Sequence, residues 1–411
     1  MNLAVIGLGK MGLPVAAYYA HRGASVVGID IDPRRVDLVN QGSNPIGGEP
    51  GVDDHLAALV TAGAVRADTS YAAVSGARVV IVLVPLITRN GKPDFSSLDA
   101  AVEGIAPHLR PETTVIFETT LPIGTTRNRY LPLLREKAPD VLVVFSPERV
   151  SSGRVWQDLD TYPKIVGGVD ADSTAAAALF YRTYLPAEVR VVGSSETAEM
   201  TKLAETTYRD LNIAFANELA RFSSEWDIDV IEVIESANSQ PFSHIHYPGV
   251  GVGGHCIPHY PYLLQESTSG SDLVAAARKV NESMPDLVAG LVENGLGSLE
   301  GKTVVLLGVA YRPGVPETTS SPAYPLAAAL ERLGSRVLAD DPLFEADQLR
   351  SLGFTPWQGE RADAFIVVTG HSAYRAFGWS EYDQAVVVDG RNALERSIVE
   401  DAGHRYVALG R

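Results

Sequence analysis

The chain has 411 residues, of which 34 are basic and 50 are acidic, so its formal net charge at pH 7 is −16. With 45% apolar and 20% charged residues it has the composition of a globular protein, and its length predicts two or three domains. The acidic balance argues against non-specific nucleic-acid binding, because such binding requires a positively charged surface. The single cysteine, Cys256, excludes an intrachain disulfide and a cysteine-rich zinc site.

The hydropathy pattern predicts no membrane partner. The longest unbroken apolar run, at 79–87, has nine residues and includes a proline, whereas a spanning helix needs about 20. The segment Met1-Asn2-Leu3 contains no basic residue and soon reaches a pair of glycines, so no signal peptide is expected. We therefore expect a soluble, cytoplasmic protein.

The first part of the chain alternates short β-branched runs with helix-like or turn-rich stretches, beginning with a strand, a helix at 11–21 and a second strand. Such alternation predicts a parallel sheet that is covered by helices on both faces. The expected strands lie at 3–7, 25–30, 78–84, 114–118, 141–145, 164–168 and 188–192.

A glycine motif, Gly7-Leu-Gly-Lys-Met-Gly12, connects the first strand to the first helix. Gly7 permits the tight turn, Gly9 lets the backbone approach a pyrophosphate, and Gly12 lets the helix pack close to the strand. Asp30 ends the second strand, where a carboxylate accepts the ribose hydroxyls, so NAD is favoured over NADP. The alternative is a strand–helix turn without a ligand. The motif predicts a cofactor site of Gly7, Gly9, Lys10, Met11, Gly12, Asp30 and Arg35, the arginine reaching the phosphates.

Beyond Gly193 the pattern becomes helical. Apolar residues from Met200 to Phe222 recur at intervals of three and four positions and predict a helix at about 196–224. At 1.5 Å per residue this helix is ~43 Å long, enough to join two domains or to pair with a second subunit. From residue 301 the alternation returns, with strands at 303–307, 336–339, 364–368 and 385–388 and a helix at 323–333.

The order strand, glycine turn, helix, strand, aspartate thus occurs twice, at 3–30 and at 303–340. We predict an α/β fold in which two Rossmann-like parallel-sheet domains are joined by a long central helix and a helical middle domain. The second turn, at Gly308, lacks the three-glycine spacing, so it holds either a different nucleotide or none.

The middle segment ends in a glycine-rich loop, Pro248-Gly-Val-Gly-Val-Gly-Gly-His-Cys256. A lone cysteine is most often a small buried hydrophobic residue. However, a loop whose backbone can come close to a ligand is a poor place for core packing. The loop therefore favours Cys256 as a nucleophile.

At this point the chain resembles the nucleotide-sugar 6-dehydrogenases, a family that includes UDP-glucose, GDP-mannose and UDP-N-acetylmannosamine dehydrogenases. The resemblance covers nearly the whole chain, and the GVGGHCI spelling is most similar to the N-acetylhexosamine branch. The motifs are GLGKMG at 7–12, ETTLPIGTT at 118–126, SPER at 146–149, AEMTKLAETTYRDLNIAFANELA at 198–220, GVGGHC at 251–256 and VVVDGRN at 386–392.

The resemblance implies a four-electron oxidation of a sugar CH2OH to a carboxylate with two NAD per turnover. A thiolate suits this reaction because it captures the aldehyde as a thiohemiacetal and later leaves from a thioester. By position, Cys256 is the nucleophile and Lys202 stabilises the oxyanion. Glu148 is the general base, and Thr120 positions a water molecule beside the nicotinamide.

The resemblance also implies three domains and the remaining site residues. The domains are an NAD-binding Rossmann domain at 1–193, a central helical and dimerisation domain with the cysteine at 194–296, and a C-terminal nucleotide-sugar-binding domain at 297–411. NAD is further bound by Pro85, Thr119 and Thr120. The substrate is bound by Lys202, Thr206, Gly249, Gly251, Gly253, Gly254, Tyr260, Arg312 and Arg391.

Each assignment has a structural alternative. Lys202 is otherwise a solvated helix lysine, Glu148 an acid paired with Arg149, and Arg391 a turn arginine. His255 and His259 flank the cysteine closely enough to lower the pKa of its thiol, or they only line the pocket. With His244 and His246 they also resemble a zinc site, but no acidic ligand accompanies them.

Several positions depart from the family pattern on the substrate side. Tyr260 stands where the family has an aspartate, and Thr206 where it has a helix asparagine. Leu86 replaces a cofactor-side threonine, and Arg312 replaces a substrate-side lysine. Two family arginines have no counterpart, one before the glycine-rich loop and one in the C-terminal signature. Either the sugar substrate or the chemistry differs from that of the usual family members. We favour a different sugar because the nucleophile and Lys202 are retained.

Three functions compete. The first is the four-electron dehydrogenase of a nucleotide sugar, UDP-linked by the family's frequency. The second is a two-electron hydroxy-compound dehydrogenase that depends on Lys202, and the third is a non-catalytic protein that binds NAD or a nucleotide sugar. The central helix and the resemblance both predict a homodimer or higher homo-oligomer joined through 196–290.

Overall fold

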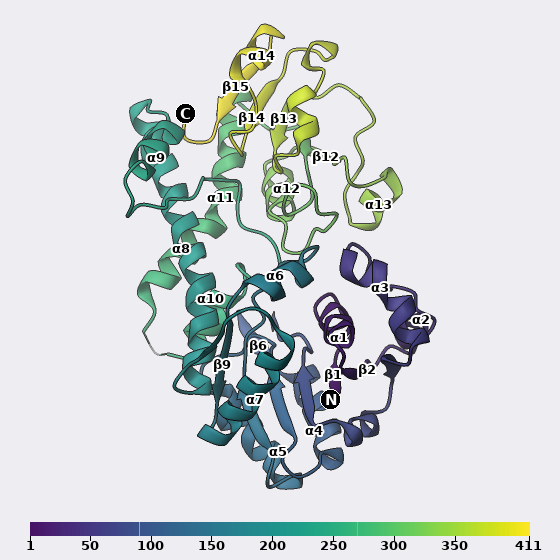
Figure 1. Cartoon of the computed structure of the whole chain (residues 1–411). Helices are drawn as coiled ribbons and strands as arrows, with labels where there is room; N and C mark the ends of the chain where they lie inside the picture. The colour runs from purple at the N-terminus through teal and green to yellow at the C-terminus, as the bar shows by residue number, and fades with distance from the viewer. Residues whose placement is uncertain (90, 269) are drawn as a thin grey trace. The chain divides into compact units, whose positions relative to one another are not determined.

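The structure is a computed structural model that describes residues 1–89, 91–268 and 270–411 (Figure 1). These residues form two compact units, one of Met1–Glu205 with Tyr262–Ser269 and one of Thr206–Pro261 with Gly270–Arg411. The long helix α8, Ser195–Trp226, belongs to both. The α/β fold class is confirmed, whereas the domain limits at residues 193 and 296 stay a prediction.

The first unit is built on a sheet in which eight strands are described, in the order β10-β9-β8-β7-β4-β1-β2-β3. Neighbouring strands pair in parallel except β8 and β9, which are antiparallel. The strands are β1 (Asn2–Ile6), β2 (Ser25–Ile29), β3 (Val65–Asp68), β4 (Val79–Val82), β7 (Thr114–Phe117), β8 (Leu142–Phe145), β9 (Lys164–Gly168) and β10 (Val189–Val191), with a separate hairpin of β5 (Ile87–Arg89) and β6 (Lys92–Asp94).

Helices cover both faces of this sheet, as the alternation of strands and helices predicts. The longer helices are α1 (Gly12–His21), α2 (Pro33–Asn40), α3 (Pro50–Thr61), α4 (Ser96–Ile105), α5 (Leu131–Lys137), α6 (Val155–Thr161) and α7 (Ala171–Tyr184), and the short helical turns are η1 (Tyr71–Gly76), η2 (Ala106–His108) and η3 (Thr126–Tyr130).

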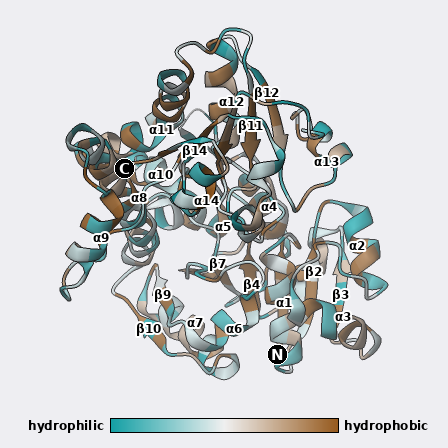
Figure 2. Ribbon diagram, turned by 90° about the horizontal axis from the view of Figure 1, so that it is seen from above, coloured by the Kyte–Doolittle hydropathy of each residue, from teal (hydrophilic) through white to brown (hydrophobic). Residues whose placement is uncertain are grey.

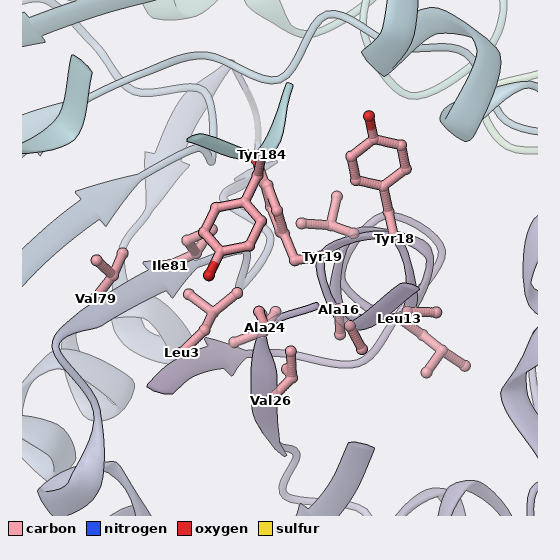
Figure 3. Close-up of a cluster of buried hydrophobic side chains, with 14 of the residues drawn as sticks. Leu3, Leu13, Ala16, Tyr18, Tyr19, Ala24, Val26, Val79, Ile81 and Tyr184 are labelled. Carbon is pink, nitrogen blue, oxygen red and sulfur yellow. The ribbon is translucent and has the colours of Figure 1, made fainter. Parts of the chain in front are cut away.

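The core of the first unit has two layers because successive strand side chains point to opposite faces. In β1, Leu3 and Val5 pack into one buried cluster together with α1 and α7, whereas Ala4 and Ile6 pack into the other together with α4. Figure 3 shows the first layer, where Tyr19 of α1 lies near Tyr184 of α7, with ring centroids 5.8 Å apart.

The second unit has a sheet of five described strands, all parallel, in the order β12-β11-β13-β14-β15. Its central strands are apolar, as the colour of β11 in Figure 2 shows. The elements are α9 (Val230–Asn238), α11 (Asp272–Leu296), β11 (Thr303–Leu307), α12 (Ala323–Arg332), β12 (Arg336–Asp340), α13 (Ala346–Ser351), β13 (Ala364–Val367), η4 (Ser372–Ala376), η5 (Trp379–Glu381), β14 (Val386–Asp389), α14 (Arg396–Asp401) and β15 (Arg405–Ala408). The helix α10 (Tyr260–Glu266) starts in this unit, but from Tyr262 on it belongs to the first.

The apolar stripe that predicts α8 lies at the surface of the described chain. Tyr208, Phe215 and Phe222 are 58%, 48% and 54% exposed. The opposite face of the helix is buried although it is partly polar. There Asp210 pairs with Arg278 of α11 at 2.6 Å, so the buried charge is compensated. Within the described residues, no helix combines the length and apolarity that a membrane crossing requires.

The first half of α8 is attached to the sheet of the first unit by Glu199. This buried carboxylate accepts hydrogen bonds from the Gly124 N–H at 2.6 Å, the Thr126 N–H at 2.8 Å and the Thr126 hydroxyl at 2.6 Å. Burial raises the pKa of Glu199 to about 7, although these hydrogen bonds oppose the shift. One carboxylate therefore fixes the loop between β7 and η3 to the helix.

The stability of the protein should depend on pH through Glu199. Because its folded-state pKa is raised, the group contributes most below the unfolded pKa near 4.5, and the contribution is lost as the pH rises through about 7. Relative to the Glu199→Gln variant, the wild type should lose about 2 kcal/mol of unfolding free energy between pH 5 and pH 8. Urea unfolding at both pH values measures this difference, and an equal difference at both would contradict it.

Candidate active site

The glycine turn after β1 has the geometry of a dinucleotide site. Gly7 has a φ of +90°, and a Cβ on Gly12 would lie 1.8 Å from the Gly7 carbonyl oxygen, so both positions require glycine. By contrast, a Cβ on Gly9 would meet no atom within 4 Å. The absence of a side chain at Gly9 is therefore not needed for packing, and it leaves room for a phosphate at the N-terminus of α1. Lys10 is exposed and Met11 is half-buried in the same turn.

Asp30, directly after β2, faces this turn. It accepts a hydrogen bond from the Leu8 N–H at 2.8 Å and one from the Asp32 N–H at 3.0 Å. The guanidinium of Arg35 pairs with the same carboxylate at 2.9 Å. Asp30 is thus held where the motif predicts a ribose-binding acid, and Arg35 would have to leave or share this pair to reach a phosphate.

Two further segments end at the same edge of the sheet, because β7, β4 and β1 are parallel neighbours. Thr119 and Thr120 follow β7 and are both buried. The Thr119 hydroxyl donates to the Val84 carbonyl at 2.7 Å, which fixes the segment with the exposed Pro85. The carboxyl edge of a parallel sheet is where α/β proteins bind ligands. These residues fit NAD together with the glycine turn.

Glu148 lies after β8 and is held by a buried cation rather than by the Arg149 side chain. One of its oxygens accepts hydrogen bonds from the Arg149 N–H at 2.7 Å and the Val150 N–H at 3.2 Å, and the other lies 3.0 Å from the ammonium of Lys164. Burial alone would raise the pKa of Glu148, but Lys164 and the hydrogen bonds lower it below its usual value. Glu148 is therefore an ionised carboxylate at neutral pH.

Lys202 is not a solvated lysine, since only 10% of its side chain is exposed. It lies on the buried face of α8, 3.5 Å from Glu205 one turn further on. Glu205 also binds the guanidinium of Arg149 at 2.7 Å, so a chain of charges joins the loop after β8 to Lys202. Thr206 is buried next to Glu205 on the same helix.

In the second unit, Cys256 is exposed, so the buried-hydrophobe alternative is wrong. Its carbonyl oxygen accepts hydrogen bonds from the Tyr260 N–H at 2.9 Å and the His259 N–H at 3.1 Å at the start of α10. The preceding Gly254 N–H donates to the Thr319 carbonyl at 2.8 Å, and a Cβ there would lie 3.2 Å from the ring of Tyr311. The glycines thus let the cysteine loop pack closely on the segment after β11.

That segment also holds both histidines beside the cysteine. His255 contacts the carboxylate of Glu317, and His259 hydrogen-bonds the hydroxyl of Ser320 at 3.1 Å. Burial lowers the pKa of His259 below its usual value. The residues described by the structure include no group of three or more His, Cys, Asp or Glu side chains arranged for a metal ion.

Arg391 follows β14 and braces the same loop. Its Nε donates to the Val368 carbonyl at 2.7 Å and its terminal nitrogen to the Gly251 carbonyl at 3.5 Å. A Cβ on Gly249 would lie 2.3 Å from the guanidinium, so glycine is needed there for the arginine to approach. Burial lowers the pKa of Arg391 to about 10. Arg391 is therefore more than a turn arginine.

The predicted site residues fall into two groups. The first unit brings together the glycine turn, Asp30, the two threonines, Glu148 and Lys202, and the second unit brings together Cys256, its glycines, Tyr260 and Arg391. Arg312, in the second unit, lies with its guanidinium 5.8 Å from the centre of the Tyr311 ring.

Sequence reasoning missed four neighbours of these groups. Lys164 belongs to a strand of otherwise apolar and glycine residues, and few of the basic residues are lysines. Glu118 is the first residue of the ETTLPIGTT motif. These two features are visible in the sequence and could have indicated Lys164 and Glu118 as site residues. Nothing local marks Glu205 or Tyr311.

Comparison with known proteins places the whole chain in one family. Residues 1–185, 196–283 and 305–396 match the NAD binding, central and UDP binding domains of the UDP-glucose/GDP-mannose dehydrogenase family. A UDP-N-acetyl-D-mannosamine dehydrogenase of Pyrococcus horikoshii is 34% identical, over 100% of this chain and 99% of that protein.

Solved structures agree. The UDP-D-ManNAc dehydrogenase from Pyrococcus horikoshii has a TM-score of 0.91 at 32% identity, covering 100% of this chain and 99% of the other. An NDP-N-acetyl-D-galactosaminuronic acid dehydrogenase from Methanosarcina mazei has a TM-score of 0.86 at 27% identity, covering 100% and 95%.

The fold and the dinucleotide turn thus define an NAD-dependent oxidoreductase. More narrowly, the chain belongs to the UDP-glucose/GDP-mannose dehydrogenase family, whose substrates are nucleotide sugars. The resemblance, the NAD cofactor and the class of enzyme predicted from the motifs are confirmed. The roles of individual site residues stay predictions.

The two glycines of the turn offer a matched test of the NAD site. Gly9→Ala should fold like the wild type, because its Cβ meets nothing, but it should bind NAD about tenfold or more weakly because the methyl group takes the place of a phosphate. Gly12→Ala should instead lower the unfolding free energy by about 1–3 kcal/mol, since its Cβ collides with backbone. Calorimetric titration with NAD and denaturant unfolding separate the two effects; unchanged NAD affinity in Gly9→Ala would refute the site.

Proposed function

We propose that the protein oxidises the C6 hydroxymethyl group of a UDP-linked N-acetylhexosamine to the carboxylate, in a four-electron reaction through Cys256. The observation that carries the proposal is the full-length similarity, at 31–34% identity, to relatives named UDP-N-acetyl-D-mannosamine dehydrogenase. The exposure of Cys256 on a glycine-rich loop supports the covalent route.

The residues divide the chemistry by their charge and position. Glu148, ionised by its contact with Lys164, accepts the hydroxyl proton and later the proton of a hydrolytic water. The thiolate of Cys256 adds to the aldehyde carbon to form a thiohemiacetal and leaves from the thioester when water replaces it. Lys202, a buried cation, stabilises the negative oxygen in both steps, and Thr120 orients the water.

NAD, when bound, accepts one hydride in each oxidation, so that alcohol, two NAD+ and water give carboxylate, two NADH and three protons. The glycine turn would hold its pyrophosphate, Asp30 its ribose, and Pro85 and Thr119 would border it.

The substrate-side departures support a sugar other than glucose. Tyr260 begins α10 and its N–H donates to the Cys256 carbonyl. The residue that replaces the family aspartate therefore lies in the same turn as the cysteine. Arg312 and Arg391 are the arginines assigned to the nucleotide sugar in this proposal. We also propose a cytoplasmic location, because the thiol has to stay reduced.

The reaction is tested by a panel of UDP-N-acetylmannosamine, UDP-N-acetylgalactosamine, UDP-glucose and GDP-mannose, with NADH absorbance and product mass. We expect two NADH per acid formed and activity with a UDP-N-acetylhexosamine. Cys256→Ala should form no acid, because the aldehyde is no longer captured.

Other results select the alternatives. One NADH per product with Cys256→Ala still active would indicate the two-electron reaction that depends on Lys202. Binding without turnover across the panel would indicate a non-catalytic protein.

We also propose that the exposed stripe of α8 joins two subunits, since contiguous apolar surface of this kind is typical of interfaces. Light scattering of the wild type should give at least twice 43.9 kDa. Phe215→Glu should lower this mass, because it places a charge in the stripe. Leu179→Glu, at an exposed apolar position of α7, is the control and should leave it unchanged. A wild-type monomer would rule out the proposal.

A further inference from the structure

The contact between Glu148 and Lys164 belongs to a larger buried cluster. The ammonium of Lys164 lies 3.0 Å from Glu148 and 2.9 Å from Glu118, the residue directly after β7. At most 8% of any of these three side chains is exposed. One lysine therefore bridges two carboxylates in a place that water scarcely reaches.

The cluster contains more acidic than basic groups. Two carboxylates and one ammonium leave a net charge of −1 when all are ionised, and burial makes such a charge costly. The hydroxyl of Tyr181 donates to one oxygen of Glu118 at 2.6 Å. The other oxygen of Glu118 and the buried hydroxyl of Tyr19 form no hydrogen bond with the part of the chain that the structure describes. Glu118 is thus the less completely compensated acid.

The electrostatics follow from this arrangement. Burial raises the pKa of Glu118 to about 7, which Lys164 opposes and Glu148 reinforces. The pKa of Glu148 is lowered instead, because backbone N–H groups add to the effect of Lys164. For Lys164, burial lowers the pKa but the two carboxylates outweigh it and raise it. As the pH falls, Glu118 is therefore protonated before Glu148.

Other charged and titratable groups face Glu148 from the elements around it. Lys202 on α8 stabilises the ionised form, and Arg149 beside it is paired with Glu205. On the far side, Asp158 of α6 and Tyr162 line a small hollow together with Glu148 and Lys164. Among these, Lys164 is the cation that contacts the Glu148 carboxylate directly.

We propose that Lys164 is a positioning residue of the reaction, which sets the lowest pH at which Glu148 acts as a base. Lys164 keeps Glu148 ionised, whereas Glu118 takes up its proton first and is neutral at the pH where Glu148 is protonated. Neither residue gains or loses a proton in the reaction; Glu148 takes up the proton of the sugar hydroxyl and releases it to water. The inference rests on the proposed role of Glu148.

Replacement of Lys164, but not of Glu118, should shift the acid limb of the pH profile. Glu148 is active as the carboxylate, so kcat/KM falls when the pH drops through its pKa. Lys164→Met removes the attraction and should move this limb up by about one to three pH units, whereas Glu118→Gln replaces a group that is already neutral at that pH and should leave the limb in place. Lys164→Arg keeps the charge and should restore the wild-type limb.

Controls separate this effect from a structural one. Lys137→Met removes an exposed lysine of the same unit and should leave the limb unchanged. A merely structural role would lower kcat at every pH without moving the limb. If Lys164→Met does not fold, Lys164→Gln takes its place, and an unmoved limb in a folded variant that lacks the Lys164 charge overturns the inference.

Failure of the proposed function is distinguishable. Full activity in Glu148→Gln at all pH values would remove the base itself, whereas an inactive Glu148→Gln with an unmoved limb in Lys164→Met would overturn only the inference. A titration without substrate gives an independent readout. The carboxyl 13C signal of Glu148, assigned by its loss in Glu148→Gln, should titrate at higher pH in Lys164→Met than in the wild type and in Glu118→Gln, and equal midpoints in the wild type and Lys164→Met would refute the proposal.

Discussion

The placement of α8 depends on the hydrogen bonds that one buried carboxylate accepts from a loop. Glu199 takes three donors from Gly124 and Thr126, and this interaction attaches the helix to the sheet of the first unit. Lys202 follows within one turn, so the attachment determines which edge of the sheet its ammonium approaches. Further along the same helix, Asp210 pairs with Arg278. Lys202 and Asp210 thus lie on one continuous helix.

The sequence predicted the parts of the fold that local patterns determine. The three glycines, the aspartate after β2 and most strands of both sheets follow from spacing that is visible within 30 residues, whereas β3 and β15 were not predicted. The buried face of α8 does not, because its apolar stripe is exposed while Lys202 and Asp210 are buried. That arrangement depends on ion pairs with residues far along the chain. Lys164 stands out locally in an apolar strand, but its contact with Glu118 could not be predicted because that partner lies 46 positions away.

The charges of the first unit are balanced locally, which bears on how an acidic chain accepts anionic ligands. Arg35 pairs with Asp30, Arg149 with Glu205, and Lys164 with two carboxylates. These cations therefore add little net positive potential near the glycine turn. A pyrophosphate bound there depends mainly on backbone N–H groups and on the N-terminus of α1. In the second unit, Arg391 donates hydrogen bonds to the carbonyls of Val368 and Gly251, so it supports the shape of the cysteine loop.

The reversed direction of β9 has a consequence for the chemistry of the sheet edge. In a fully parallel sheet, the first residue of a strand lies at the edge opposite to the one where ligands bind. Because β9 runs antiparallel to β8, its first residue, Lys164, lies at the edge where β7 and β8 end and where Glu118 and Glu148 follow them. The direction of a single strand thus determines which side chains meet at the sheet edge. With β9 antiparallel, Lys164 lies beside Glu118 and Glu148, whereas a parallel β9 would place it at the opposite edge.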